Sequence, residues 1–121
     1  MIIAIIIALL FISAASKAVM DKLQFHFAQS WFAGAKKQQW WNPKLSHRNK
    51  YTWSNNKFIA WSLQTWLVSI TDAWHLFGFF RDFSLFSAVA VASGNYWFLL
   101  LYPVYRLNFH LFFHYLLNKT L

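Results

Sequence analysis

The first eighteen residues, MIIAIIIALLFISAASKA, carry one charged side chain, that of Lys17. An apolar run of this length approaches the roughly 20 residues that a helix needs to cross a membrane. A secretory signal peptide has a similar run, and the small residues from Ser13 to Ser16 resemble a cleavage site. A signal peptide also has a basic segment before the apolar run, and none precedes it here. We therefore expect a retained membrane span over about residues 2–30, with Gly34 as the signal that stops the helix.

The amino-acid composition favours the same class of protein. Of the 121 residues, 59% are apolar and only 12% are charged, against about 25% charged residues in an average soluble domain. A chain this short forms one domain, and its small core cannot bury 14 Phe and 8 Trp side chains. Because the chain has no cysteine, disulfides, thiolate metal ligands and cysteine nucleophiles are excluded. The composition predicts an all-α membrane helical bundle that forms a single domain over residues 1–121.

One segment, residues 33–57, differs from the rest because it is basic and has no acidic residue. Its cations are Lys36, Lys37, Lys44, Arg48, Lys50 and Lys57. Basic loops remain on the cytoplasmic side of a membrane, so we expect this loop to be cytoplasmic and the N-terminus to lie outside. Trp and Tyr side chains bracket the cations, as in segments that lie at the level of lipid headgroups. Nucleic acid also attracts such cations, but the apolar remainder of the chain argues against a nucleic-acid partner.

The remainder of the chain can be divided in two ways. In the first, residues 57–70 form an interfacial helix, and spans follow over residues 71–93 and 95–119. In the second, residues 57–77 are themselves a span and two more follow, giving four spans in all. The second division leaves a last segment of about 16 residues that contains Arg106, although about 20 apolar residues are usual. We favour three spans, with Thr71 or Asp72 capping the second span and a tight turn at Gly94-Asn95.

This hairpin would place two polar stripes face to face. In an antiparallel pair of helices that turns at this point, residues whose numbers add to about 188 lie at equal depth, because both arms rise by ~1.5 Å per residue. His75 then lies between the levels of His110 and His114. Asp82 lies level with Arg106, which predicts an ion pair between them. The first span adds Asp21 and His26 at its cytoplasmic end, so we expect one layer of ionisable groups near the basic loop.

The chemistry of this layer points to a metal ion. Two histidines four residues apart lie on one face of a helix, and the pattern D-x-x-H at residues 72–75 adds an oxygen and a nitrogen ligand suited to Zn²⁺ or Fe²⁺. The predicted metal ligands are His26, Asp72, His75, His110 and His114, and the candidate catalytic carboxylates are Asp21 and Asp72.

Simpler interpretations of the same residues stay open. His110 and His114 have the character of interfacial side chains among lipid headgroups. Asp72 has the position of a helix N-cap, and Asp21 lies one helical turn after Lys17, where an ordinary ion pair forms.

Several short motifs resemble an uncharacterised family of small integral membrane proteins of Bacteroidetes-type bacteria. They are VMD (19–21), QFHF (24–27), WWNP (40–43), S-x-x-N-K-Y (46–51) and TDAWHLF (71–77). The resemblance covers about residues 19–80, and its motifs are specific only in combination. The chain departs from the family in having His47 where an aromatic residue is usual, and in lacking a Gly-rich insert before the TD pair. The resemblance implies a membrane location and a shared site, but no reaction. The residues it singles out are Asp21, His26, Asn42, Arg48, Asn49, Lys50, Tyr51, Asp72 and His75.

These observations lead to three functional hypotheses. In the first, Asn42, Arg48, Lys50 and Arg106 hold the phosphate of a lipid or lipid-linked substrate at a bacterial inner membrane, and a metal-activated water makes the protein a hydrolase or transferase. In the second, the protein is a non-catalytic subunit or scaffold that pairs with a partner membrane subunit. In the third, it is a homo-oligomer that conducts protons or ions through the polar layer.

Overall fold

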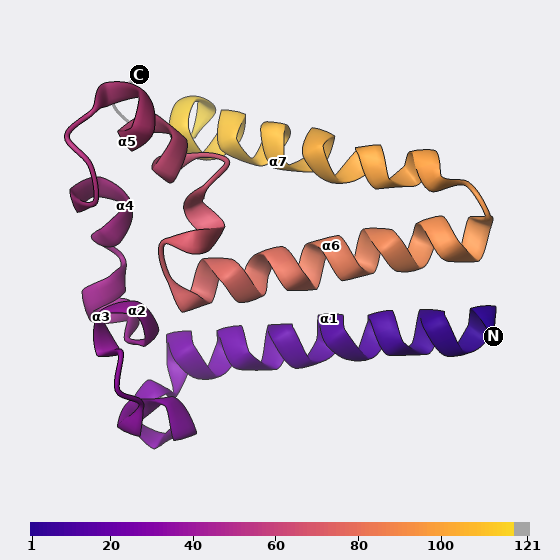
Figure 1. The fold of residues 1–121 in the computed structure, drawn as a ribbon, viewed down its shortest axis with the longest axis horizontal. Coiled ribbons are helices and arrows are strands. Elements are labelled where there is room, and N and C mark those ends of the chain that lie inside the picture. Colours follow the sequence, from indigo (N-terminus) through magenta and orange to yellow (C-terminus); the bar gives the residue numbers. More distant parts are fainter. Residues whose placement is uncertain (118–121) are drawn as a thin grey trace.

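The computed structural model describes residues 1–117, with every side chain in that range except those of His114 and Tyr115. Within these residues the chain is all helical, without a strand. Three long helical segments run antiparallel to their neighbours, and a layer of short helices covers one end of them (Figure 1). The long helices are α1 (Ile2–Phe25), α6 (Ala73–Ser93) and α7 (Leu101–Leu111). The expected all-α fold is confirmed.

Helices α1 and α6 form the main packed pair of the fold (Figure 1). The buried side chains of α1 follow one stripe, at Ser13, Ser16, Met20 and Leu23. These residues are three or four apart, which places them on one face of the helix. The hydroxyl of Ser13 donates a hydrogen bond to the carbonyl oxygen of Arg81 in α6, at 3.0 Å. A short polar side chain can do this only where the two backbones approach closely.

The hairpin between α6 and α7 has the capping residues that the sequence predicts. The carboxylate of Asp72 accepts a hydrogen bond from the backbone N–H of His75 at 2.9 Å and so caps the start of α6. Gly94 ends α6 with a φ of 70°, which is the left-handed region that glycine enters without strain. The side chain of Asn95 then caps the 3₁₀ turn η4 (Tyr96–Leu100), which leads into α7.

Aromatic side chains join α6 to α7. The ring of Tyr102 lies edge-on to those of Phe79, Phe83 and Phe86, with centroid distances of 5.7, 5.9 and 6.0 Å. Residue numbers 86 and 102 add to 188, which is the sum expected for equal depth. The predicted register of the hairpin therefore agrees with these contacts.

The layer at the end of the long helices, residues 26–70, is called the cap below. It consists of single helical turns and one slightly longer helix (Figure 1). They are η1 (Phe27–Gln29), η2 (Trp31–Gly34), α2 (Gln38–Trp41), α3 (Pro43–Ser46), α4 (Asn49–Thr52), α5 (Lys57–Gln64) and η3 (Val68–Ile70). The basic loop expected over residues 33–57 is thus folded as helical turns.

Two predicted helix boundaries are wrong. The first span was expected to remain helical to about residue 30, but α1 ends at Phe25, and His26 leaves the helical conformation with φ −137° and ψ 34°. The interfacial helix was expected to reach residue 70, but α5 ends at Gln64 because Thr65 adopts φ −118° and ψ −95°. The backbone N–H of Leu67 then bonds back to the carbonyl of Ser62 at 2.8 Å and closes a wide turn.

Helices α1 and α6 are each long and apolar enough to cross a membrane, by length and composition. The four-span alternative required a continuous helix over residues 57–77, and the structure breaks that segment after Gln64. Helix α7 continues through the π turn η5 (Phe112–Leu116) to the end of the described residues. The remaining part of the span expected over residues 95–119, from residue 118, lies outside the described residues.

Gly78 provides a test of the α1–α6 contact. A Cβ atom at this position would lie 3.3 Å from the terminal methyl carbon of Met20. We expect Gly78→Leu to force the two helices apart and to destabilise the protein by about 1–3 kcal/mol, as overpacked cores do. Thermal unfolding in detergent measures this change.

Gly34→Leu is the matched control, because a Cβ at Gly34 meets nothing within 4 Å. Gly78→Ala should be close to neutral, because the flexible end of Met20 can move. Equal unfolding temperatures for Gly78→Leu and Gly34→Leu would contradict close packing at this point.

Candidate functional site

The buried Asp72 and the partly exposed His75 form a pair at the start of α6. The side chain of Asp72 is nearly inaccessible, since the residue is only 2% exposed. His75 Nδ1 lies 2.7 Å from Asp72 Oδ2 and 2.9 Å from Oδ1, and the hydroxyl of Thr71 donates to Oδ2 at 3.1 Å. A carboxylate at this distance accepts a hydrogen bond from Nδ1, so it favours the tautomer that carries the imidazole proton on Nδ1. The N-cap expected of Asp72 is confirmed, and the same carboxylate also orients a histidine.

The cap is fastened to this end of α6 by Asn49, which is 2% exposed. Its amide nitrogen donates to the carbonyl oxygens of Gln39, at 2.9 Å, and of Thr71, at 2.7 Å. Its amide oxygen accepts from Gln39 Nε2 at 3.0 Å. One side chain therefore holds α2, α4 and the residue before Asp72 together.

Asn49 was not among the site residues predicted by physical reasoning, although the family resemblance singles it out. Nothing in the sequence around Asn49 distinguishes this residue from the other polar residues of the basic loop. The role of its partner Thr71 follows from the fold of residues 38–52, which the sequence did not reveal.

The residues expected to bind phosphate lie in different settings. Asn42 Oδ1 accepts from the backbone N–H of Lys44 at 3.0 Å, so this side chain caps α3. The ammonium of Lys50 lies over the ring of Tyr51, 5.3 Å from its centre. Arg48 is exposed at the start of α4. Phosphate binding by these residues stays a prediction.

Asp21 and His26 are also placed by the structure. Asp21 forms an ion pair with Lys17 at 2.7 Å, one helical turn apart and about half exposed, which is the simpler of the two interpretations. His26 is exposed at the C-terminal end of α1. Ligand or catalytic roles for these two residues stay predictions.

The ion pair expected between Asp82 and Arg106 is wrong. Asp82 instead binds its neighbour Arg81, with Nε to Oδ1 at 2.8 Å and NH2 to Oδ2 at 3.3 Å. Equal depth places two residues at one level but does not turn them toward each other, and the flexible Arg81 reaches the carboxylate from the same helix.

Arg106 therefore has different neighbours from those expected. Its NH2 group lies 3.4 Å from His110 Nε2, and its guanidinium lies over the ring of Phe109 at 5.5 Å. The chain has three acidic residues, and all three are paired elsewhere, with Lys17, His75 and Arg81. Within residues 1–117, Arg106 has no carboxylate partner.

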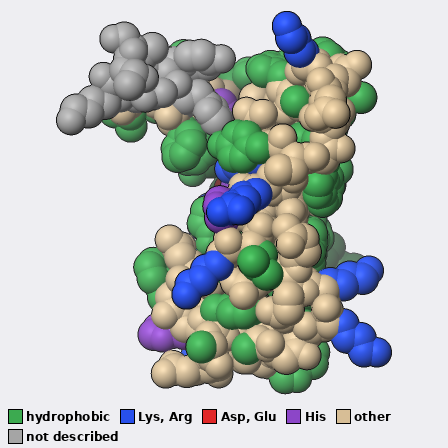
Figure 2. All heavy atoms as spheres, turned by 90° about the vertical axis from the view of Figure 1, so that its left-hand side faces the viewer, with side chains coloured by type: hydrophobic (Ala, Val, Ile, Leu, Met, Phe, Trp, Pro, Cys, Tyr) green, Lys and Arg blue, Asp and Glu red, His purple; other side chains and the backbone are tan. Residues whose placement is uncertain are grey.

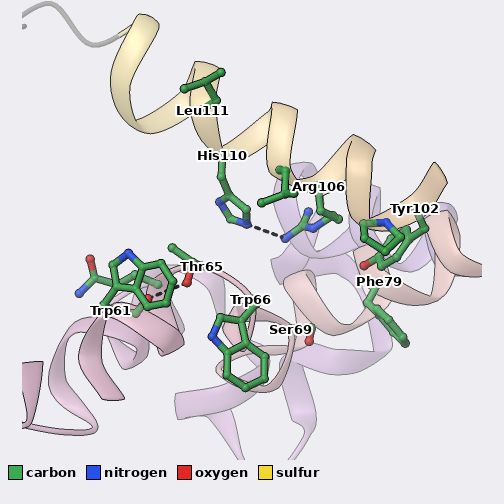
Figure 3. A pocket seen from close by; sticks show the side chains of 12 residues that line it. Trp61, Thr65, Trp66, Ser69, Phe79, Tyr102, Arg106, His110 and Leu111 are labelled. Carbon is green, nitrogen blue, oxygen red and sulfur yellow. Dashed lines mark hydrogen bonds between the residues drawn. The ribbon is translucent and has the colours of Figure 1, made fainter. Parts of the chain in front are cut away.

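Arg106 and His110 line a groove between the cap and the α6–α7 hairpin (Figure 3). The groove encloses a volume of about 830 Å³. Trp61, Thr65, Trp66 and Ser69 form the wall on the cap side, and Phe79, Tyr102, Arg106 and His110 form the wall opposite (Figure 3). Most of its lining is apolar, and its polar groups are few. Neither the groove nor its tryptophans were predicted, because the cap wall depends on the turn that follows Gln64.

The residues expected to bind a metal are not gathered into one cluster in the part of the chain that the structure describes. Among these side chains, no three His, Asp or Glu residues lie close enough to hold a metal ion. The nitrogen of His75 that faces Asp72 is occupied by that carboxylate. The side chain of His114 lies outside the described residues, and a metal site that includes it stays a prediction.

No model of a known protein family matches this chain, and neither a curated protein nor a solved structure matches it.

The Asn49 contact leads to a second prediction. Asn49→Ala removes the donors to two carbonyls and leaves them without these bonds, at a cost of about 2–4 kcal/mol for attachment of the cap. We expect trypsin to cleave the folded protein after Lys44 and Arg48 at least about tenfold faster in this variant. The control is Asn55→Ala, because Asn55 is exposed in the same segment. Equal cleavage rates for the two variants would show that Asn49 does not hold the cap.

Proposed function

We propose that this chain is a three-span integral membrane protein that binds phosphate-bearing lipids at the membrane face where its cap lies. The first two spans are α1 and α6, which have the required length and composition. The third is the helical segment of residues 96–116, which has Pro103 in the first turn of α7 and contains Arg106. It returns antiparallel to α6 and ends beside the cap (Figure 1), as a span of similar length must.

The side chains of the cap suit the headgroup layer of a bilayer. Trp31 is 87% exposed and Trp66 is 62% exposed, although tryptophan is usually buried in water-soluble proteins. At a membrane interface such rings are stabilised between headgroups and acyl chains. Figure 2 views the cap side of the molecule, and Lys and Arg side chains project from it between apolar ones.

The observation that carries the proposal is the charge balance of the folded cap. Lys36, Lys37, Lys44, Arg48 and Lys57 are exposed. No acidic residue lies between Asp21 and Asp72, and the carboxylate of Asp72 is already occupied by His75. The counter-charge of these cations therefore comes from outside the chain. In the headgroup layer, lipid phosphates supply it.

The same charges fix the proposed orientation. Basic segments next to spans remain in the cytoplasm, so the cap faces the cytoplasm, and the N-terminus and Gly94 lie on the opposite side. In a bacterium, as the resemblance implies, this is the inner membrane.

The more specific hypotheses drawn from the sequence remain proposals beside this one. A metal-dependent hydrolase or transferase acting on a lipid phosphate would use His75 Nε2, together with ligands that include His114. A non-catalytic partner subunit and a conducting homo-oligomer would need no metal. Elemental analysis of the purified protein separates the first from the other two, because only the first requires about one equivalent of bound Zn or Fe.

The cap cations provide the third prediction. Replacing Lys36, Lys37, Lys44 and Arg48 together by glutamine should reduce the preference for anionic over zwitterionic lipid by about 1 kcal/mol per charge removed. The measurement counts phosphatidylglycerol and phosphatidylcholine that remain bound to the purified protein, by native mass spectrometry.

The matched control exchanges the same four residues between Lys and Arg, which keeps the charge. In wild type, the preference should also weaken as ionic strength rises. An unchanged lipid preference in the glutamine variant would refute binding of lipid phosphate by the cap.

A further inference from the structure

The groove between the cap and α7 contains a cation in an unusual place. Arg106 lies twelve residues beyond Gly94, about 18 Å along the hairpin at ~1.5 Å per residue. The hydrocarbon core of a bilayer is about 30 Å thick, so in the proposed three-span arrangement Arg106 lies within it. Charged residues at such depths face a cavity or the interior of a bundle, and they mark sites.

Within residues 1–117, no contact of Arg106 gives its charge a matching anion. Its described neighbours are an imidazole nitrogen and an aromatic ring, and neither carries a negative charge. Among residues 1–117, the three Asp carboxylates are paired with Lys17, His75 and Arg81. An anion that enters the groove would complete this site.

The walls of the groove restrict what kind of anion can enter. Figure 3 shows Arg106 and His110 directed from α7 into the space that Trp61, Thr65 and Trp66 face from the other side. The lining continues through Phe79, Leu107 and Leu111, which offer apolar surface. Ligand sites have this character, with mainly apolar walls and a few polar groups that orient the ligand, and they commonly enclose about 300–1,000 Å³. The groove falls within that range at about 830 Å³.

We propose that this groove is a binding site for one molecule of a single-chain lipid phosphate. The phosphate group binds Arg106, and the hydrocarbon chain lies against the aromatic wall of the groove. The proposal rests on the proposed function and deepens it, since it assigns one defined site in addition to the cap. The planar guanidinium can donate two parallel hydrogen bonds to a phosphate. A free phosphate ion fits the cation equally well but gains nothing from the apolar walls.

The probe is dodecyl phosphate, titrated into the purified full-length protein in a non-ionic detergent and counted by native mass spectrometry. We expect one tightly bound molecule per chain. Dodecylphosphocholine has the same chain with a zwitterionic head, and inorganic phosphate has the charge without the chain. Both should bind at least about tenfold more weakly. Inorganic phosphate that binds as tightly as dodecyl phosphate would assign the site to a free phosphate and overturn the proposal.

Substitutions in the α7 wall and in the cap wall of the groove test where the bound molecule lies. Arg106→Gln should weaken binding about 10- to 100-fold, which is the loss expected when hydrogen bonds from a charged donor are removed. Arg106→Lys should lose less, because it keeps the charge but not the paired donors. Ser69→Phe fills the groove from the cap side without changing any charge on α7, so it should also weaken binding, and it covers the case in which Arg106→Gln does not fold.

The control for location is Lys22→Gln, which removes an exposed cation of α1 outside both the cap and the groove and should leave the single tight site unchanged. Wild-type affinity in both Arg106→Gln and Ser69→Phe would overturn the proposal. So would a dimer in the same spectra that Ser69→Phe abolishes, because a second copy would then occupy the groove. These outcomes are independent of the lipid preference of the cap, so failure of one proposal is distinguishable from failure of the other.

Discussion

The antiparallel pairing of α1 with α6 determines where the connecting segment and the cap lie. The bond from Ser13 to the carbonyl of Arg81, and the fit of Met20 against Gly78, fix the two helices side by side. The end of α1 and the start of α6 therefore lie at the same end of the molecule, and residues 26–72 must remain there. In the proposed membrane arrangement this connection lies next to the hydrocarbon core, and backbone polar groups that water does not reach there need partners within the chain. Folding as short helical turns provides these partners, and Asn49 then fastens these turns to the residue before Asp72.

Charge pairing explains how the cations of the chain divide into two groups. With 11 Lys and Arg and 3 acidic residues, the net charge is +8, and most cations have no acid with which to pair. The three carboxylates are used locally, and two of them join residues on the same helix. The unmatched cations of the cap are exposed, whereas Arg106 lies in an apolar groove. We propose that both groups of cations bind external anions. Because the cap cations are exposed and Arg106 lies in an apolar groove, we expect the cap to bind the headgroup layer and Arg106 to bind a single lipid.

The elements that the sequence predicted correctly are those with local signals. Asp72 and Gly94 bound α6 because an N-cap side chain and a left-handed glycine act within a few residues of the helix end. The pair of Lys17 with Asp21, which the sequence left open beside a catalytic role for Asp21, follows from helical spacing alone. The register of the α6–α7 hairpin follows from the position of its turn and from the constant rise of a helix.

The features that were missed depend on contacts between distant segments. Helix α1 ends at Phe25 and α5 breaks at Thr65, and neither position has a Gly or Pro that would predict the end of a helix. The pairing of Asp82 with Arg81, and not with Arg106, depends on rotation about the helix axis, which depth arithmetic does not give. The burial of Asn49 depends on how the cap folds over residues 38–72, and single-sequence periodicity carries no information about that contact.

In the proposed arrangement, the cap and the turn at Gly94 lie on opposite sides of one membrane. Because the chain has no cysteine, single cysteines can be introduced at Ile2, Asn55 and Tyr96 and labelled with a membrane-impermeant maleimide in intact cells. We expect labelling of the cysteines at positions 2 and 96 in intact cells, and labelling at position 55 only after the membrane is permeabilised. Equal labelling at positions 55 and 96 in intact cells would place both on one side and contradict the three-span arrangement.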